Sequence, residues 1–274
     1  MAVTMADIAH LRKMSGAGMM DCKKALEESD NDFDKAMEII RKKGQAVAAK
    51  RSDREASEGC VLAADNGEFA AVVALKCETD FVAKNEEFIG LTQQILDVAM
   101  DKKPAALADL LALPLSDGRA IENHITDRIG VTGEKMELGF YEFVSGAATV
   151  SYIHPGNKLA TIVAFNQTLD KQAARDVAMQ VAAMNPVALV SKDVPQSVID
   201  SEMEIARDKA RQAGKPENLL DRIAEGALQK FFKESTLLQQ EFVKDPKITI
   251  EQYLHQQDKA LTATAFKRVT LNVE

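Results

Sequence analysis

At Thr79-Asp80-Phe81-Val82-Ala83-Lys84, an apolar run of the chain gives way to a helical pattern. The run before it, Ala70–Leu75, is continuously apolar and predicts a buried strand. After it, apolar residues recur at helical spacing to about Met100, at Phe88, Leu91, Ile95 and Val98. Thr79 or Asp80 takes the N-cap position, because either side-chain oxygen can accept from the unpaired N–H groups of a first helical turn. The stretch therefore predicts a corner between a strand and a helix.

Phe81 follows this cap directly, so an aromatic ring stands beside an acid at the corner. Corner residues usually serve caps and packing, which favours a hydrophobic anchor within the chain's own core. The alternative is a ring held out toward a partner. The residues alone leave both interpretations open.

The composition predicts a globular, soluble chain of two or three modules, since its 274 residues are 46% hydrophobic and 28% charged. No run approaches the ~20 apolar residues of a membrane span, and Met1–Thr4 lacks the features of a secretory signal. The net charge of −8 argues against broad nucleic-acid binding, which requires many phosphate contacts. Three cysteines, an odd number in no metal-type spacing, favour a reduced, cytoplasmic setting; they are Cys22, Cys60 and Cys77.

Residues 1–50 are expected to form a compact three-helix unit, followed by a linker at 51–58. Thr4–Asp7 resembles a capping box at the start of the first helix. A glycine-containing loop, 15–18, ends that helix, because glycine tolerates the backbone reversal. The third helix is expected to end near Gly44, with a helical tail beyond it. A unit of this length can bury only a small core, and it is therefore expected to be tethered to a larger body.

Met19 and Met20 follow the glycine loop of this unit. Both could pack in the core, but in so small a unit at least one is expected at the surface. Exposed methionines suit adaptable protein contacts because their side chains are flexible and polarisable. Core packing and partner contact stand at this point as equal alternatives.

The central part of the chain predicts an α+β fold built from two similar halves, at 59–140 and 141–274. In the first half, strands at 59–64 and 68–76 are joined by Asn-Gly, a strong hairpin signal. Short helices follow around 107–113 and 119–129. A second set of strands and a helix capped by Asp170 repeat the plan, which predicts an internal duplication; these strands are expected at 136–144, 148–154 and 159–165.

Residues 195–234 break this pattern and predict an antiparallel helical arm. Apolar residues keep coiled-coil spacing on both sides of a turn at 214–216; they are Ile199, Met203, Ala206 and Ala210, then Leu220, Ile223, Ala227 and Phe231. Their stripe either seals the two helices together or also meets a second protein. A short helix and a last strand, 261–273, complete the chain.

No pattern of catalytic or metal-binding residues is present. Gly-x-Ser-x-Gly is absent, and the four histidines show no metal-type spacing; they are His10, His124, His154 and His255. His154 precedes Pro155-Gly156, at a turn between strands where side chains point outward. It is either a surface histidine of no special role or a contact residue.

Two long stretches resemble the signatures of the translation elongation factor Ts family. They are Leu11-Arg12-Lys13-Met14-Ser15-Gly16-Ala17-Gly18-Met19-Met20-Asp21-Cys22-Lys23-Lys24-Ala25-Leu26 and Leu75-Lys76-Cys77-Glu78-Thr79-Asp80-Phe81-Val82-Ala83-Lys84. Both are specific and stand in the family's order, and the resemblance covers nearly the whole chain.

The resemblance implies a ubiquitin-associated-type module at 1–50, two α+β core subdomains and a coiled-coil arm. It implies guanine-nucleotide exchange on elongation factor Tu, with Thr79–Val82 wedged beside the partner's magnesium site to displace the ion. Arg12, Met19 and Met20 would hold the partner's GTPase domain, and His154 would approach its phosphate-binding side.

The same resemblance implies no covalent catalysis, no cofactor or metal of the chain's own, and no direct contact with nucleic acid or membrane. Loss of magnesium would weaken nucleotide binding because the ion neutralises the phosphates. A homodimer through the helical arm is a further alternative.

The resemblance departs from the family at Lys76 and Cys77, so the strand edge is expected to differ slightly there. Some members also carry a C-terminal helical module, whose contacts are not expected beyond the predicted last strand. Two other classes of function are alternatives. One is a scaffold that binds proteins without exchange activity, and the other is a small-molecule enzyme, which nothing in the sequence favours.

Overall fold

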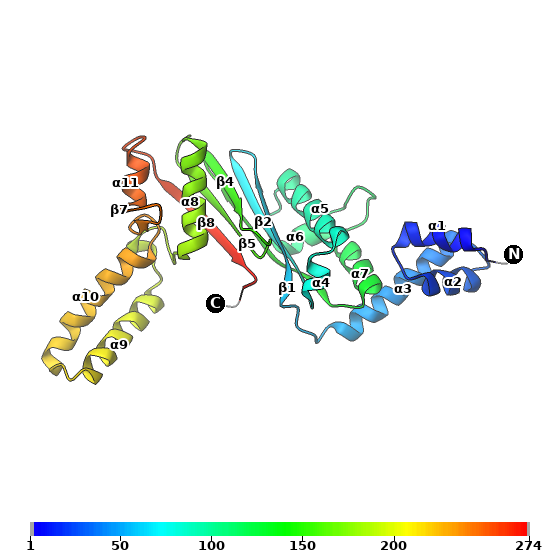
Figure 1. Ribbon diagram of the computed structural model, residues 1–274, viewed down its shortest axis with the longest axis horizontal. Helices are drawn as coiled ribbons and strands as arrows, with labels where there is room; N and C mark the ends of the chain where they lie inside the picture. The colour runs from blue at the N-terminus through cyan, green and yellow to red at the C-terminus, as the bar shows by residue number, and fades with distance from the viewer. Residues whose placement is uncertain (1–2, 273–274) are drawn as a thin grey trace.

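The computed structural model describes residues 3–272 and shows an elongated α+β molecule in three parts (Figure 1). A group of three helices lies at one end, two packed sheets with their helices form the centre, and a helical hairpin projects at the other end. Among the described residues, no helix is long and apolar enough to cross a membrane. Met1 and Ala2 of the predicted N-terminal stretch, and Val273 of the predicted last strand, lie outside the described residues.

The three N-terminal helices are α1 (Met5–Ser15), α2 (Met19–Glu28) and α3 (Phe33–Arg51). The predicted capping box is confirmed, since Thr4 and Asp7 bond each other's backbone N–H groups. Gly16 ends α1 in the left-handed region, at a φ of 69°, where glycine has no Cβ penalty. These helices share a small core of their own, made of Ile8, Leu11, Ala17, Cys22, Ala25, Leu26 and Ala36.

The prediction that the third helix ends near Gly44 is wrong, because α3 continues as one helix to Arg51. Gly44 is buried where α3 crosses α7 (Ile121–Thr132), opposite Gly130. A Cβ built on Gly130 would lie 2.6 Å from the Gly44 Cα, so the two backbones pass too closely for any side chain on Gly130. The glycine serves helix packing here, not helix termination.

The first sheet consists of β1 (Glu58–Asp65), β2 (Phe69–Cys77) and β3 (Met136–Ser145), all antiparallel in the order β1-β2-β3. Its outer face packs on α5 (Glu86–Lys102), α6 (Leu107–Ala112) and α7. The expected boundary at 140/141 falls inside β3, which pairs with β2 along its length and so belongs to the first half.

The helix expected to run unbroken from Asp80 to about Met100 is in fact two helices. A single turn, α4 (Asp80–Ala83), stops at Lys84, and α5 begins after Asn85. The Asn85 side chain accepts from the N–H groups of Glu87 and Phe88, at 2.9 and 3.3 Å, and so caps α5 separately.

The second sheet has the order β4-β5-β8 and consists of β4 (Ala148–Ile153), β5 (Leu159–Phe165) and β8 (Ala263–Thr270). Helix α8 (Lys171–Met184) covers its outer face, and its predicted cap is confirmed, since Asp170 accepts from the N–H groups of Gln172 and Ala173. Both halves thus run strand, turn, strand, helix, while their origin by duplication stays a prediction.

The two sheets pack face to face between these helical layers (Figure 1). The contact is made of aliphatic side chains, mostly alanine and valine; among them are Val61, Ala70, Val72, Ala74, Ala160, Ile162 and Ala164. Central strands β2 and β5 are therefore covered on both faces, which is why they are continuous apolar runs without alternation.

The helical hairpin consists of α9 (Gln196–Gln212) and α10 (Glu217–Ser235), which pack antiparallel after a short 3-10 helix, Ser191–Asp193. The buried seam contains Ala206, Ala210, Leu220 and Ala224. The stripe predicted for the second helix is partly wrong, because Ala227 is exposed. The buried positions there follow i, i+4 spacing from Leu220 to Ala224.

The base of the hairpin is joined to α8 through a compact segment with β6 (Glu241–Phe242), β7 (Asp245–Thr249) and α11 (Ile250–His255). The buried carboxylate of Asp176 on α8 accepts from Lys244 Nζ at 2.7 Å and from the Tyr253 hydroxyl at 3.0 Å. Burial alone would raise the pKa of Asp176, but the hydrogen bonds from Lys244, Gln172 and Tyr253 outweigh it and the pKa is lowered. The carboxylate therefore stays ionised and holds this segment on α8.

Tyr253→Phe is expected to destabilise the chain near neutral pH and to lose this effect in strong alkali. Burial, and then the hydrogen bond to Asp176, raise the pKa of the Tyr253 hydroxyl to about 12. A raised pKa gives stability that is fully present below the unfolded value near 10 and is lost as the pH rises toward 12. In urea unfolding at pH 8, the free energy of unfolding of the variant should be about 1 kcal/mol lower than that of wild type. At pH 11 this difference should be smaller. An equal difference at both would contradict the assignment.

Candidate functional site

The corner predicted from the sequence exists, and Thr79 is its cap. Strand β2 ends at Cys77, and Thr79 has extended backbone angles, φ −124° and ψ 155°, before α4 begins. The Thr79 hydroxyl oxygen accepts from the Val82 N–H at 3.4 Å, which satisfies one unpaired donor of the helical turn.

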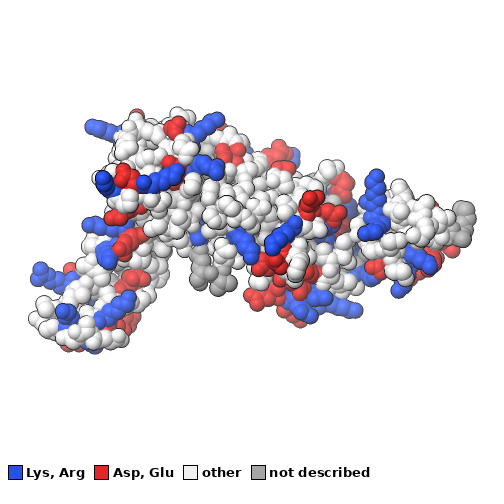
Figure 2. Space-filling model, viewed as in Figure 1, with Lys and Arg blue, Asp and Glu red and all other residues white. Residues whose placement is uncertain are grey.

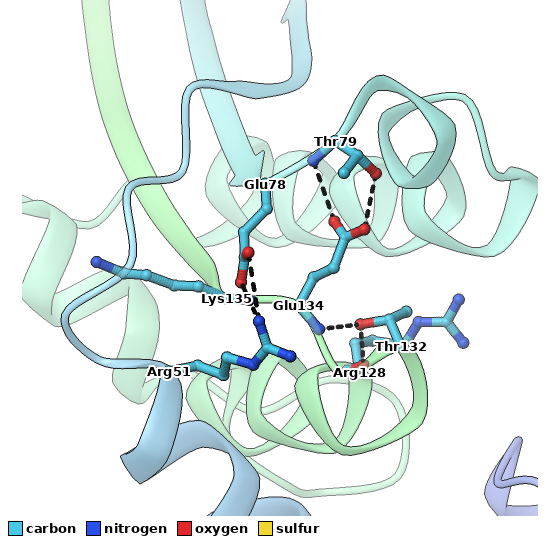
Figure 3. Close-up of polar contacts among 7 residues, drawn as sticks. All are labelled: Arg51, Glu78, Thr79, Arg128, Thr132, Glu134 and Lys135. Carbon is cyan, nitrogen blue, oxygen red and sulfur yellow. Dashed lines mark hydrogen bonds and ion pairs between the residues drawn. The ribbon is translucent and has the colours of Figure 1, made fainter.

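Glu134 braces this cap from a distant part of the chain (Figure 3). Its carboxylate accepts from the Thr79 N–H at 3.1 Å and from the Thr79 hydroxyl at 2.7 Å. Glu134 follows the end of α7, and its own N–H donates to the Thr132 hydroxyl at 3.2 Å. The orientation of the corner is thus set by α7 as well as by β2.

Glu78, the residue before the cap, is held in the same way. Its carboxylate accepts from the Lys135 N–H at 2.7 Å, and both oxygens lie 3.5 Å from Arg51 Nη1 at the end of α3 (Figure 3). Two acids at the corner are therefore used to hold the backbone and are not free for other chemistry.

Phe81 is the most exposed of the large hydrophobic side chains in the described residues, at 83%. Its neighbour Val82 is half-buried against the core of the first sheet, and Ala83 is buried. The turn is thus fixed by the residues after Phe81, while the ring itself points into solvent. This exposure excludes the anchor interpretation, and a contact with a partner stays a prediction.

Asp80 lies beside Phe81 and pairs with Lys84, with Oδ2 and Nζ 2.6 Å apart. The hydrogen bond from Lys84 lowers the pKa of this exposed carboxyl, and the charge of Lys158 adds to the effect. Lys158 comes from the turn between β4 and β5 and pairs with Glu58 at 2.7 Å. That turn therefore lies at the same end of the sheets as α4.

His154 starts this β4–β5 turn, as predicted, and is exposed. Its Nδ1 lies 3.1 Å from the Tyr152 hydroxyl, which fixes the ring over the end of β4. The structure therefore brings the His154 turn and the Thr79–Val82 corner to one end of the central body.

Arg12, Met19 and Met20 are all exposed on the N-terminal helices, the two methionines at 43% and 65%. Core packing is thereby excluded for both methionines. These helices lie at the far end of the molecule from the hairpin, and α4 lies in the central body (Figure 1). The structure thus presents two separate surfaces rather than one cluster.

Residue types that bind metals do not cluster within the described residues, 3–272. No three His, Cys, Asp or Glu residues there could hold a metal ion. The three cysteines are buried, and burial raises the pKa of Cys60 to about 11 and of Cys77 to about 12, which disfavours the reactive thiolate form of these two residues. On the face drawn in Figure 2, basic and acidic side chains are interspersed.

The bracing residues carry no signal that sequence reasoning could have found. Glu134 is 55 positions from Thr79 and Arg51 is 27 from Glu78, so no local pattern connects them. The break before α5 did have a local signal, since Asn85 is followed by two glutamates at the start of a helical pattern.

Glu134→Ala is expected to destabilise the corner by about 1 to 3 kcal/mol, because it leaves the Thr79 N–H and hydroxyl without their acceptor. Chemical unfolding and amide hydrogen exchange at Thr79 measure this. Glu137→Ala is the control: its carboxylate lies 3.2 Å from Lys76 and 3.4 Å from Lys135 in half-exposed ion pairs, and it should cost under about 1 kcal/mol. Equal effects of the two changes would contradict the brace.

Comparison with known proteins places this corner in a family. A sequence model of the family described as Elongation factor TS matches residues 78–272. Proteins named Elongation factor Ts are similar over the full length of both chains: that of Porphyromonas gingivalis is 74% identical over 274 residues, and that of Azobacteroides pseudotrichonymphae is 56% identical over 275. The protein of the same name from Parabacteroides distasonis is 48% identical over 331 aligned positions.

Proposed function

Since the chain belongs to the elongation factor Ts family and so acts in translation elongation, we propose that it is the guanine-nucleotide exchange factor for elongation factor Tu. In this proposal it binds the GDP form of that GTPase in the cytoplasm, displaces the partner's Mg²⁺ and promotes GDP release. GTP can then bind the emptied partner.

The observation that carries the proposal is the exposed Phe81 ring on a braced helical turn. A side chain that is to displace an ion and its ligands must keep its position against resistance, and the Glu134 and Glu78 contacts supply that fixation. Within the Thr79–Val82 segment, Phe81 and Asp80 are the groups presented to a partner, and Thr79 and Val82 hold them.

The exchange itself needs only differential binding. Mg²⁺ neutralises the phosphates of a bound nucleotide, so its displacement weakens GDP binding. A factor that binds the empty partner more tightly than the loaded one must, by linkage, weaken nucleotide binding by the same ratio. The chain therefore needs no cofactor, no metal of its own and no covalent step.

The remaining sites complete the proposed interface. Arg12, Met19 and Met20 contact the partner's GTPase domain, and exposed methionines suit such an adaptable contact. His154 approaches the phosphate-binding side, which its place beside the corner supports. Homodimer formation through the helical arm stays a prediction.

The proposed organisation is a ubiquitin-associated-type module at 1–50, a linker at 51–58 and two core subdomains, the second with a coiled-coil arm at 195–234. The sheet pairing supports a boundary between the subdomains at the turn after β3 rather than at 140/141.

Release of a fluorescent GDP analogue from elongation factor Tu of the same organism, with and without this protein and across Mg²⁺ concentrations, tests the proposal. Strong acceleration, largest where Mg²⁺ is low enough to be displaced, is expected. Binding without acceleration would refute exchange and leave the alternative of a protein-binding scaffold.

A further inference from the structure

Helix α3 belongs to two hydrophobic cores at once. Near its start, Ala36 is buried among the N-terminal helices, with Met37 packed beside it. Near its end, Val47 and Ala48 pack against the core of the first sheet. One continuous helix of 19 residues therefore joins the N-terminal unit to the central body, with a length of about 28 Å.

Three contacts fix this helix along its length. An ion pair between Lys43 and Asp21 connects it to α2. At the next residue, the close passage of Gly44 and Gly130 seats it on α7. At its end, Arg51 reaches the Glu78 carboxylate beside the Thr79 cap. The helix thus connects the surface bearing Met19 and Met20 to the corner that bears Phe81.

We propose that α3 is a rigid spacer that holds these two surfaces at a fixed separation, so that one partner molecule engages both together. The Gly44–Gly130 crossing is the feature that sets this separation. The inference rests on the proposed function and adds to it the requirement that both surfaces bind as a unit.

The physical reason is effective concentration. Once one surface has bound, a rigid spacer presents the second at its site, whereas a displaced or flexible one must search for it. Part of the binding free energy is then spent on ordering the helix instead of displacing the partner's ion. A change that moves α3 should therefore weaken exchange without touching either contact surface.

Gly130→Ala tests the crossing directly. Its Cβ would lie 2.6 Å from the Gly44 Cα, a backbone atom, so α3 and α7 must move apart. Gly90→Ala is the matched control, since Gly90 is also inside a helix and a Cβ there meets nothing within 4 Å. Both changes raise helix propensity alike, so the difference between them reports the crossing.

The separation is measured by paired spin labels at Lys24→Cys on α2 and Gln94→Cys on α5, both exposed positions. The native cysteines are buried and do not compete for label. The same proteins are assayed for affinity to elongation factor Tu and for acceleration of GDP release. Gly130→Ala should shift or broaden the distance distribution and weaken acceleration about 10-fold or more, and Gly90→Ala should match wild type.

A second variant guards against misfolding of the first. Gln45→Gly with Ala46→Gly softens α3 at two exposed positions between its two cores, adds no volume, and should broaden the distances and weaken exchange in the same way. The spacer proposal would be overturned if the label distances changed while acceleration of GDP release stayed within about twofold of wild type. It would also be overturned if the distances were unchanged in both variants. Failure of the proposed function is separate, because it appears as no acceleration by the wild-type chain.

Discussion

Phe81→Ala is expected to reduce the acceleration of GDP release from elongation factor Tu by about 30-fold or more, while leaving the fold intact. The ring is 83% exposed, so its removal costs the free chain under about 0.5 kcal/mol. Truncation of an aromatic anchor at the centre of an interface typically costs at least about 2 kcal/mol, which corresponds to a change of roughly 30-fold. The fluorescent GDP assay at saturating concentration of the variant measures the loss in the exchange step itself.

Phe140→Ala is the matched control for this change. Phe140 is also an exposed phenylalanine, at 41%, but it lies within β3, opposite Ala74 of β2, and not on α4. The Phe140→Ala variant should accelerate GDP release from elongation factor Tu as much as wild type does. A Phe81→Ala protein that binds with undiminished affinity and accelerates release normally would contradict the wedge role, even with exchange activity established.

The features predicted correctly from the sequence are those whose causes are local. The capping box at Thr4 and the cap at Asp170 each depend on residues within three positions. The strand at Ala70–Leu75 was predictable because it is covered on both faces and so lacks alternation. The strand-to-helix corner followed from these two kinds of signal.

The features that were missed depend on contacts between distant segments. Gly44 carries the ordinary signal of a helix end, and only its partner Gly130 shows that it serves a close crossing. Membership of β3 in the first sheet depends on pairing with β2, which turn lengths do not specify. The exposure of Phe81 likewise depends on tertiary packing, in which Val82 and Ala83 are the residues that meet the core, so the sequence left its two interpretations open.

The corner combines a stiff turn with an exposed aromatic ring. The carboxylates of Glu78 and Glu134 accept hydrogen bonds from backbone N–H groups, and Glu78 also pairs with Arg51. These contacts make the turn stiff. The Phe81 ring, by contrast, is left in water. Glu78 and Glu134 thus account for the stiffness of the turn, while the packing of Val82 and Ala83 leaves the Phe81 ring outside the core.

Gly59→Ala is expected to destabilise the central sheets by about 3 kcal/mol or more, a larger loss of stability than either Glu134→Ala or Tyr253→Phe should cause. Gly59 lies on β1 opposite Lys76, with a φ of 155° that other residues rarely adopt. A Cβ there would lie 2.3 Å from the Leu75 carbonyl oxygen and 2.9 Å from the Lys76 Cα. Both are backbone atoms of β2, so relief requires the two strands to separate just before the Thr79 corner.

Gly139→Ala separates this backbone collision from crowding in general. Its Cβ would also meet an atom at 2.3 Å, but that atom is Cδ of the flexible Lys76 side chain, which can turn aside. In thermal unfolding, Gly59→Ala should therefore lower the melting temperature by roughly 6 to 12 °C, and Gly139→Ala should lower it by no more than about 4 °C. Because the strands separate next to the corner, the Gly59→Ala protein that remains folded should also accelerate GDP release from elongation factor Tu only weakly. A stable Gly59→Ala protein with normal exchange would show that the β1–β2 pairing does not position Phe81.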